Sequence, residues 1–229
     1  MSHLGLALVI CGAYGGFIGL FSAILLAQEH AIGVWAGFDQ MKMLLVFAGI
    51  QLAIQLSATL FIGPLFQAAA AFAAFRHSRG KPGSVSHGVN FALTRYKRMF
   101  KPHLKTWLVI LLGMQLLIPG IIYWNQLVLV DSVSVFEKTK RPLQRSRQLT
   151  KGYRRTIFLM ALPWFLYGLP AFVIEPQIAG VWAGLMVPYH VIVSLFLFAL
   201  FAGYSRLYLE RTGQHEAKPD DVLAAPEEA

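Results

Sequence analysis

Residues 106–136 read TWLVILLGMQLLIPGIIYWNQLVLVDSVSVF, an apolar stretch with a Pro-Gly pair at 119–120 and a basic segment on either side. At 1.5 Å per residue, 106–118 would form a helix of about 20 Å and 121–136 one of about 24 Å. Neither comfortably crosses a hydrocarbon core of about 30 Å. Because proline and glycine favour a break in a helix, the stretch either crosses once as a broken helix or enters the membrane and returns.

The distribution of positive charge decides between these alternatives. Residues 76–105 and 138–155 each contain eight Lys or Arg residues, three more follow residue 205, and Lys42 completes the 20. A single crossing would put the two basic segments on opposite sides of the membrane, against the positive-inside rule. A return leaves only Lys42 outside the cytoplasmic face. We therefore predict a re-entrant helical hairpin covered by protein, with both chain termini cytoplasmic.

Composition predicts an integral membrane protein. The mean hydropathy is +0.56 and only 14% of residues are charged, against about 25% in soluble domains. Long continuous apolar runs predict helices rather than barrel strands. The expected fold is all-α and polytopic, in one membrane domain of residues 1–210 followed by a disordered cytoplasmic tail, 211–229. The four expected full spans are about 4–27, 43–75, 156–174 and 178–208, in addition to the hairpin at 106–136 and interfacial helices.

Residues 118–158 contain a recognisable motif. Its members are Pro119–Gly120, Glu137, Leu143, Arg145, Ser146, Leu149, Thr150 and Gly152. This arrangement resembles the membrane domain of YciC-like bacterial proteins, which also accompanies some glycerophosphodiester phosphodiesterases. The resemblance implies a multi-pass bacterial inner-membrane protein with broken helices that lie close to the interface. It does not imply phosphodiesterase activity, which belongs to a separate soluble domain.

The basic segments supply the candidate binding residues. In 76–105, Val89, Leu93, Tyr96 and Phe100 form an apolar stripe typical of an interfacial helix. The candidates for binding anionic headgroups or an acidic partner are Arg95, Lys97, Arg98, Lys101, Arg141, Arg145, Arg147, Lys151, Arg154 and Arg155. The alternative interpretation is that these charges set the topology and bind nothing. Pro142 and Gly152 suit the two ends of a short helix between them.

Small residues recur at helical spacing within the apolar runs, where they allow close helix packing. The candidate packing positions are Gly12, Gly16, Gly19, Gly49, Ala53, Ser57, Gly180 and Gly184. Gln51 and Gln55 share a helix face beside one of these series. Packing is the simpler interpretation of these faces, and a path for a polar substrate is the alternative.

Asp131 and His190 are the ionisable residues best placed within apolar runs, where such groups are functional candidates. We expect Asp131 to reach headgroup water or to pair with a nearby Arg, and His190 to be a neutral hydrogen-bonded residue. Neither the seven histidines nor the single cysteine shows metal-ligand spacing, and no nucleophile-and-base or nucleotide motif is found. The sequence therefore predicts a non-enzymatic protein with no catalytic residue, metal, cofactor or nucleic-acid partner.

Two functions fit these features. The favoured one is assembly, as a scaffold, homo-oligomer or accessory subunit of a membrane complex in contact with anionic lipids. The alternative is a transporter-like protein for a lipid or another amphipathic molecule, since transporters build binding sites from discontinuous helices. Few buried charges and no internal inverted repeat weigh against the alternative.

Overall fold

The structure is a computed structural model that describes residues 2–36, 40–116, 118–163, 166 and 185–213. These residues form helices joined by turns, which confirms the expected all-helical fold. In the described part of the chain, four segments are long and apolar enough to cross a membrane: Leu4–Leu25, Gly49–Ser78, Ile118–Phe136 and Met186–Thr212. The chain is therefore a helical membrane protein.

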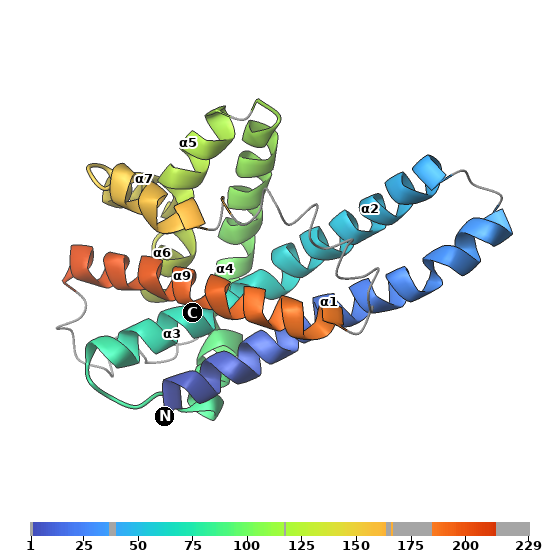
Figure 1. Cartoon of the computed structure of the whole chain (residues 1–229). Coiled ribbons are helices and arrows are strands. Elements are labelled where there is room, and N and C mark those ends of the chain that lie inside the picture. The colour runs from blue at the N-terminus through green and yellow to red at the C-terminus, as the bar shows by residue number, and fades with distance from the viewer. Residues whose placement is uncertain (1, 37–39, 117, 164–165, 167–184, 214–229) are drawn as a thin grey trace.

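Figure 1 shows the order and arrangement of the helices. They are α1 (Ser2–Ala36), α2 (Gln40–Ser57), the π-helical turn η1 (Ala58–Ile62), α3 (Gly63–Ser78), α4 (Val85–Met114), α5 (Ile118–Leu127), α6 (Val130–Phe136), α7 (Pro142–Thr150) and α9 (Met186–Thr212). Residues 154–163 are also helical. Three of the candidate spans fall within the predicted spans 4–27, 43–75 and 178–208, or extend them by a few residues. Most of the predicted span 156–174 lies outside the described residues, together with Gly180, Gly184 and most of the tail.

Helix α3 is largely buried, because it packs against α1, α4, α6 and α9. Its run of alanines, Ala68–Ala71, is at most 1% exposed. Side chains this small let several helices approach α3 closely. Phe66 and Phe72 fill the remaining space by contacting aromatic rings of α9 and α4.

Helices α1 and α9 lie side by side (Figure 1) and meet at two glycines. A Cβ atom on Gly15 would lie 2.4 Å from the carbonyl oxygen of His190, and one on Gly19 would lie 2.7 Å from that of Met186. Of the candidate packing positions, Gly19 therefore packs within the chain. The other described candidates differ: Gly12, Gly16 and Gly49 have no atom of the described residues within 4 Å of a Cβ position, and Ala53 and Ser57 are exposed.

Helices α4 and α5 form a helical hairpin. Helix α4 is continuous through Pro102 to Met114, and α5 turns back along it. The turn that follows α4 at 115–116 precedes the predicted break at Pro119–Gly120. Pro119 instead lies in the first turn of α5, where the missing N–H breaks no helical hydrogen bond. Gly120 allows the two arms to touch, because a Cβ atom there would lie 2.6 Å from Met114 Cα.

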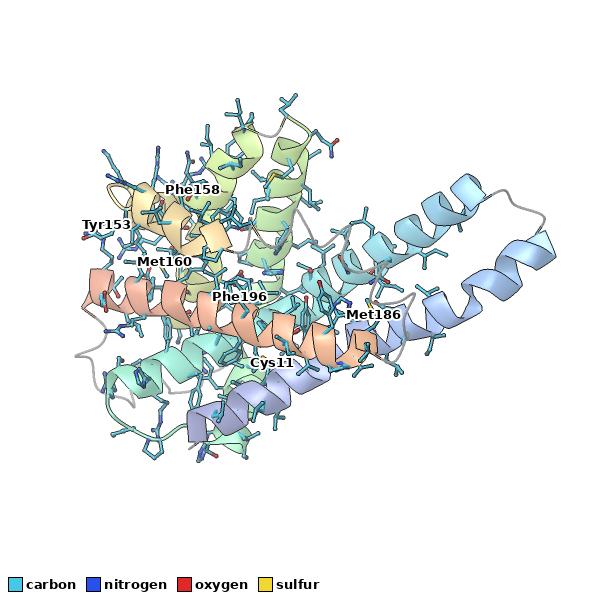
Figure 2. All side chains as sticks on the ribbon, in the orientation of Figure 1. Cys11, Tyr153, Phe158, Met160, Met186 and Phe196 are labelled. Carbon is cyan, nitrogen blue, oxygen red and sulfur yellow. The ribbon has the colours of Figure 1, made fainter. Side chains whose placement is uncertain are left out.

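The hairpin stands across α9 in Figure 1, with α7 beside α5 and α6. Helix α6 continues the return along α4 and also contacts α3. Tyr153 precedes helical residues 154–163, and Met160 lies within them. Figure 2 shows both side chains beside the C-terminal half of α9. There they pack against a buried cluster that includes Tyr204 and Tyr208.

Candidate functional site

The structure divides the ten candidate basic residues into two groups. Seven are exposed: Lys97, Lys101, Arg141, Arg147, Lys151, Arg154 and Arg155. The other three, Arg95, Arg98 and Arg145, are less exposed and bond to other segments of the chain. The predicted apolar stripe of α4 is only partly buried by other helices, since Leu93, one of its four residues, is 57% exposed. The buried face of α4 lies one position away, and it includes Phe91, Arg95 and Met99.

Arg95 and Arg98 hold the end of α6. Arg95 Nε donates to the carbonyl oxygen of Val135 at 3.2 Å, and Arg98 Nη2 donates to the same oxygen. The guanidinium of Arg95 also lies 4.0 Å from the centre of the Phe91 ring. Positive charge is favourable at a helix C-terminus. Burial and the neighbouring Arg98 lower the pKa of Arg95 to about 10, so the guanidinium remains charged at neutral pH. Arg95 is therefore a structural residue.

Helix α7 is fixed by two hydroxyl groups on one carbonyl. Ser146 Oγ donates to the oxygen of Gln126 at 2.8 Å. Thr150 Oγ1 lies 3.4 Å from the same oxygen and 3.2 Å from the carbonyl oxygen of Arg147 in its own helix, so its one proton is shared between the two. Gln126 lies at the end of α5, and a turn separates it from α6. A helix end leaves its last carbonyl groups without backbone donors. The hydroxyl groups of α7 therefore supply the hydrogen bond that the break between α5 and α6 removes.

Further motif residues complete this attachment. Arg145 Nε lies 3.2 Å from both carboxylate oxygens of Glu137, and Tyr208 OH donates to Glu137 Oε1 at 2.9 Å. Leu149 packs into the cluster that contains Tyr208. Gly152 ends the segment with a φ of 89°, which favours glycine. The motif that we identified in the sequence thus joins α7 to α5, α6 and α9.

A buried pair of ionisable residues lies between the arms of the hairpin. His103 Nδ1 on α4 lies 2.9 Å from Asp131 Oδ2 on α6, and the two residues are 0% and 6% exposed. We expected Asp131 to reach headgroup water or to pair with an arginine. Its partner is instead a histidine, which the sequence did not single out. His190 is also buried, and its Nε2 has no partner in the described part of the chain.

The π-helical turn η1 orients His103. The N–H of Gly63 donates to the carbonyl of Ala58, so the carbonyl of Thr59 loses its usual donor four residues on. His103 Nε2 takes that place at 3.0 Å. Gly63 makes room for the ring, because a Cβ atom there would lie 3.1 Å from His103 Nε2. Isolated π-helical turns of this kind are frequent at functional sites.

A cavity of about 150 Å³ opens beside the pair. Asp131 and Thr106 line it, and each has one buried oxygen, Oδ1 and Oγ1, without a hydrogen-bond partner in the described residues. Trp107 and Trp124 contribute to the walls. An apolar groove of about 240 Å³ adjoins it, lined by Ile10, Ala13, Tyr14, Phe17, Ile62, Leu65 and Phe66. Tyr14 and Phe66 line both spaces. The cavity is the strongest candidate site for a ligand.

No cluster of three or more His, Cys, Asp or Glu residues suited to a metal ion occurs within the described residues. Comparison of the chain with protein-family models, curated proteins and solved structures gives no match. The resemblance to YciC-like membrane domains therefore stays a prediction, which rests on the motif at 118–158.

Proposed function

We propose that this chain is a non-enzymatic protein of a bacterial inner membrane that acts in assembly and contacts anionic lipid headgroups through α7. One observation carries the proposal: α7 is held by Arg145, Ser146, Leu149 and Thr150, while other basic side chains stay exposed. The exposed ones on α7 and just around it are Arg141, Arg147, Lys151, Arg154 and Arg155. Each basic residue near an anionic surface contributes about 1 kcal/mol, so several on one helix form an effective contact.

The attachment of α7 also supports a re-entrant hairpin. Segment Ile118–Phe136 is long enough to cross a membrane. However, α7 contacts its middle at Gln126 and carries exposed Arg147 and Lys151 there. Charged side chains are costly in hydrocarbon, so we place this level of the hairpin at the cytoplasmic interface. Its turn is apolar and suited to lipid, since Leu116 is 72% and Ile118 is 68% exposed.

Open small-residue positions support an assembly role. Gly12 and Gly16 lie one turn apart on α1, and no atom of the described chain occupies the space above them. Such a face allows a second membrane helix to approach closely. We propose that a second copy of the chain or another membrane subunit packs there.

Lipid retention measured by native mass spectrometry tests the lipid contact. The protein in mild detergent receives equal amounts of phosphatidylglycerol and phosphatidylcholine. We expect the wild type to retain more phosphatidylglycerol, and the Arg147→Gln/Lys151→Gln variant to lose most of that preference. A Lys81→Gln/Arg206→Gln variant, which removes two exposed charges elsewhere, is the matched control. Equal retention by both variants would remove α7 as the contact.

The cavity favours a second function, the binding or transport of an amphipathic molecule. Its unpartnered oxygens on Asp131 and Thr106 lie beside an apolar groove, a combination typical of ligand sites. This function does not depend on α7, because the cavity lies between the hairpin and helices α1, α3 and α9.

A further inference from the structure

The cavity contains two unsatisfied hydrogen-bonding groups in an apolar surrounding. Asp131 is 6% exposed and Thr106 is 4% exposed, and Asp131 Oδ1 and Thr106 Oγ1 have no partner among the described residues. A buried polar atom without a hydrogen bond costs about 1–3 kcal/mol. Two such atoms on the wall of one cavity point to a guest that forms hydrogen bonds with both.

The charge of the site follows from the contacts of His103. Its Nε2 faces the carbonyl oxygen of Thr59, which can only accept, so Nε2 carries a proton. Its Nδ1 faces Asp131 Oδ2, and that contact requires one proton between the two atoms. The pair is either imidazolium with carboxylate or imidazole with carboxylic acid. In both cases the net charge of the pair is zero.

The site is neutral and presents one acceptor oxygen, on Asp131, and one hydroxyl group, on Thr106. It therefore favours a ligand that carries a hydroxyl group of its own. The guest hydroxyl donates to Asp131 Oδ1 and accepts from Thr106 Oγ1. The cavity of about 150 Å³ holds roughly five water volumes at about 30 Å³ each, which suits one small polar head. An apolar chain would continue into the groove of about 240 Å³ next to Tyr14 and Phe66.

We propose that the cavity binds one neutral amphiphile with a hydroxyl head, with its hydrocarbon chain in the adjoining groove. The inference names the ligand class for the amphiphile-binding function above and rests on that function. It is independent of the lipid contact of α7, because the two sites share no residue and their tests use different probes.

The experiment measures binding of 1-dodecanol to the full chain in mild detergent by native mass spectrometry. Dodecanoic acid and dodecylamine have the same chain with a negative or a positive head. We expect one alcohol per chain, and weaker retention of the acid and the amine. Thr106→Val removes the donor with little change of shape and should weaken binding of the alcohol about tenfold. The matched control is Thr94→Val, which removes an exposed hydroxyl on the same helix.

Asp131 variants separate a hydroxyl from a cation. Asp131→Asn keeps an acceptor oxygen for the guest and gives His103 Nδ1 a donor, so binding of the alcohol should stay within about threefold of the wild type. Asp131→Leu removes the acceptor and should weaken binding as Thr106→Val does. If Asp131→Leu does not fold, Thr106→Val decides alone.

Three results would overturn the inference. The first is unchanged binding of the alcohol in Thr106→Val. The second is no alcohol on the wild type, which would mean that the cavity holds water only and would leave the lipid preference of α7 unaffected. The third is preferred binding of dodecylamine that is lost in Asp131→Asn, which would show a cation site.

Discussion

His103 on α4 and Asp131 on α6 form a hydrogen bond of 2.9 Å across the hairpin. They pair because the chain turns back between α4 and α5, at nearly equal distances along the sequence from both residues. Both are nearly fully buried, so the contact is a buried polar link between α4 and α6, in addition to the hydrogen bonds of Arg95 and Arg98 to the carbonyl oxygen of Val135. It also sets the charge of the cavity wall.

Replacement of Asp131 should separate the hydrogen bond from the charge. In Asp131→Asn the amide N–H can donate to His103 Nδ1, so the free energy of unfolding should fall by about 1 kcal/mol or less. In Asp131→Leu the histidine loses its partner while buried, and the loss should be about 3–5 kcal/mol. Unfolding in mixed detergent, followed by circular dichroism, measures both. Equal losses would show that the hydrogen bond is not what stabilises the hairpin.

The shared carbonyl of Gln126 predicts non-additive effects on α7. Ser146→Ala leaves the Thr150 hydroxyl as a donor and should cost about 1 kcal/mol. Ser146→Ala/Thr150→Val leaves the carbonyl without either hydroxyl and should cost more than the sum of the single changes. Ser86→Ala, at an exposed site on α4, is the control. Strictly additive losses would mean that the two hydroxyls act on separate acceptors.

Replacement of Gly15 and of Gly12 on α1 by alanine should change the stability of the protein differently. Gly15→Ala puts a Cβ atom 2.4 Å from the carbonyl oxygen of His190, and overpacking of this kind costs about 1–3 kcal/mol. Gly12→Ala meets no atom of the described residues within 4 Å. In the monomer, measured below the concentration at which copies associate, it should be neutral, or stabilising by up to about 1 kcal/mol through helix propensity. Thermal stability in detergent provides the comparison. A loss in Gly12→Ala that equals or exceeds the loss in Gly15→Ala would argue against the face of α1 that we assign to the contact with α9.

A bulky residue on the open face of α1 tests assembly. Gly16→Leu should leave the fold of the single chain intact, since none of the described residues lies within 4 Å of its Cβ position. If a second helix packs there, the oligomer seen by native mass spectrometry should dissociate at protein concentrations where the wild type remains assembled. An unchanged oligomer would exclude this face as the interface.

Arg95 should matter for stability and its exposed neighbour should not. Arg95→Met removes a charged donor from Val135 and should cost about 1.5–3 kcal/mol. Lys97→Met, on the exposed face of the same helix, should change stability by less than about 0.5 kcal/mol. The same unfolding experiment measures both variants. A similar loss in each would show that Arg95 is not a special contact.

The sequence predicted the hairpin but not its centre. Unequal charge and short apolar arms predicted a chain that returns to the same side of the membrane. Helices α4 and α5 do pack as a hairpin, and its re-entry into the membrane stays a prediction. The Pro-Gly pair was assigned to the break itself. In the structure the same pair begins the second arm and allows close contact, which is an equally ordinary use of proline and glycine. Local sequence cannot distinguish these two uses.

This small error in the position of the turn concealed the buried pair. A turn at 119–120 would place Asp131 opposite residues near 108, whereas the turn that begins at 115 places it opposite His103. His103 itself follows a lysine and a proline in a basic segment, which gave no sign of burial. The π-helical turn that orients its ring also has no clear pattern in the sequence.

The basic residues also show what local sequence cannot predict. Charge counts predicted which segments are basic, but they could not predict which side chains are used inside the fold. Arg95 and Arg145 became internal partners because carbonyl and carboxylate oxygens of distant segments lie within their reach. Their neighbours Lys97 and Arg147 stayed exposed.

The central claim is tested most directly by the side of the membrane on which each of the two basic segments, 76–105 and 138–155, lies. Lys81→Cys and Lys140→Cys are introduced singly in a Cys11→Ala background, and a membrane-impermeant thiol reagent is applied to inside-out and right-side-out vesicles. We predict that both positions are labelled from the cytoplasmic face, with Lys42→Cys labelled from the other face as a control. Labelling of Lys81→Cys and Lys140→Cys from opposite faces would contradict the re-entrant hairpin and the placement of α7 against cytoplasmic lipid headgroups.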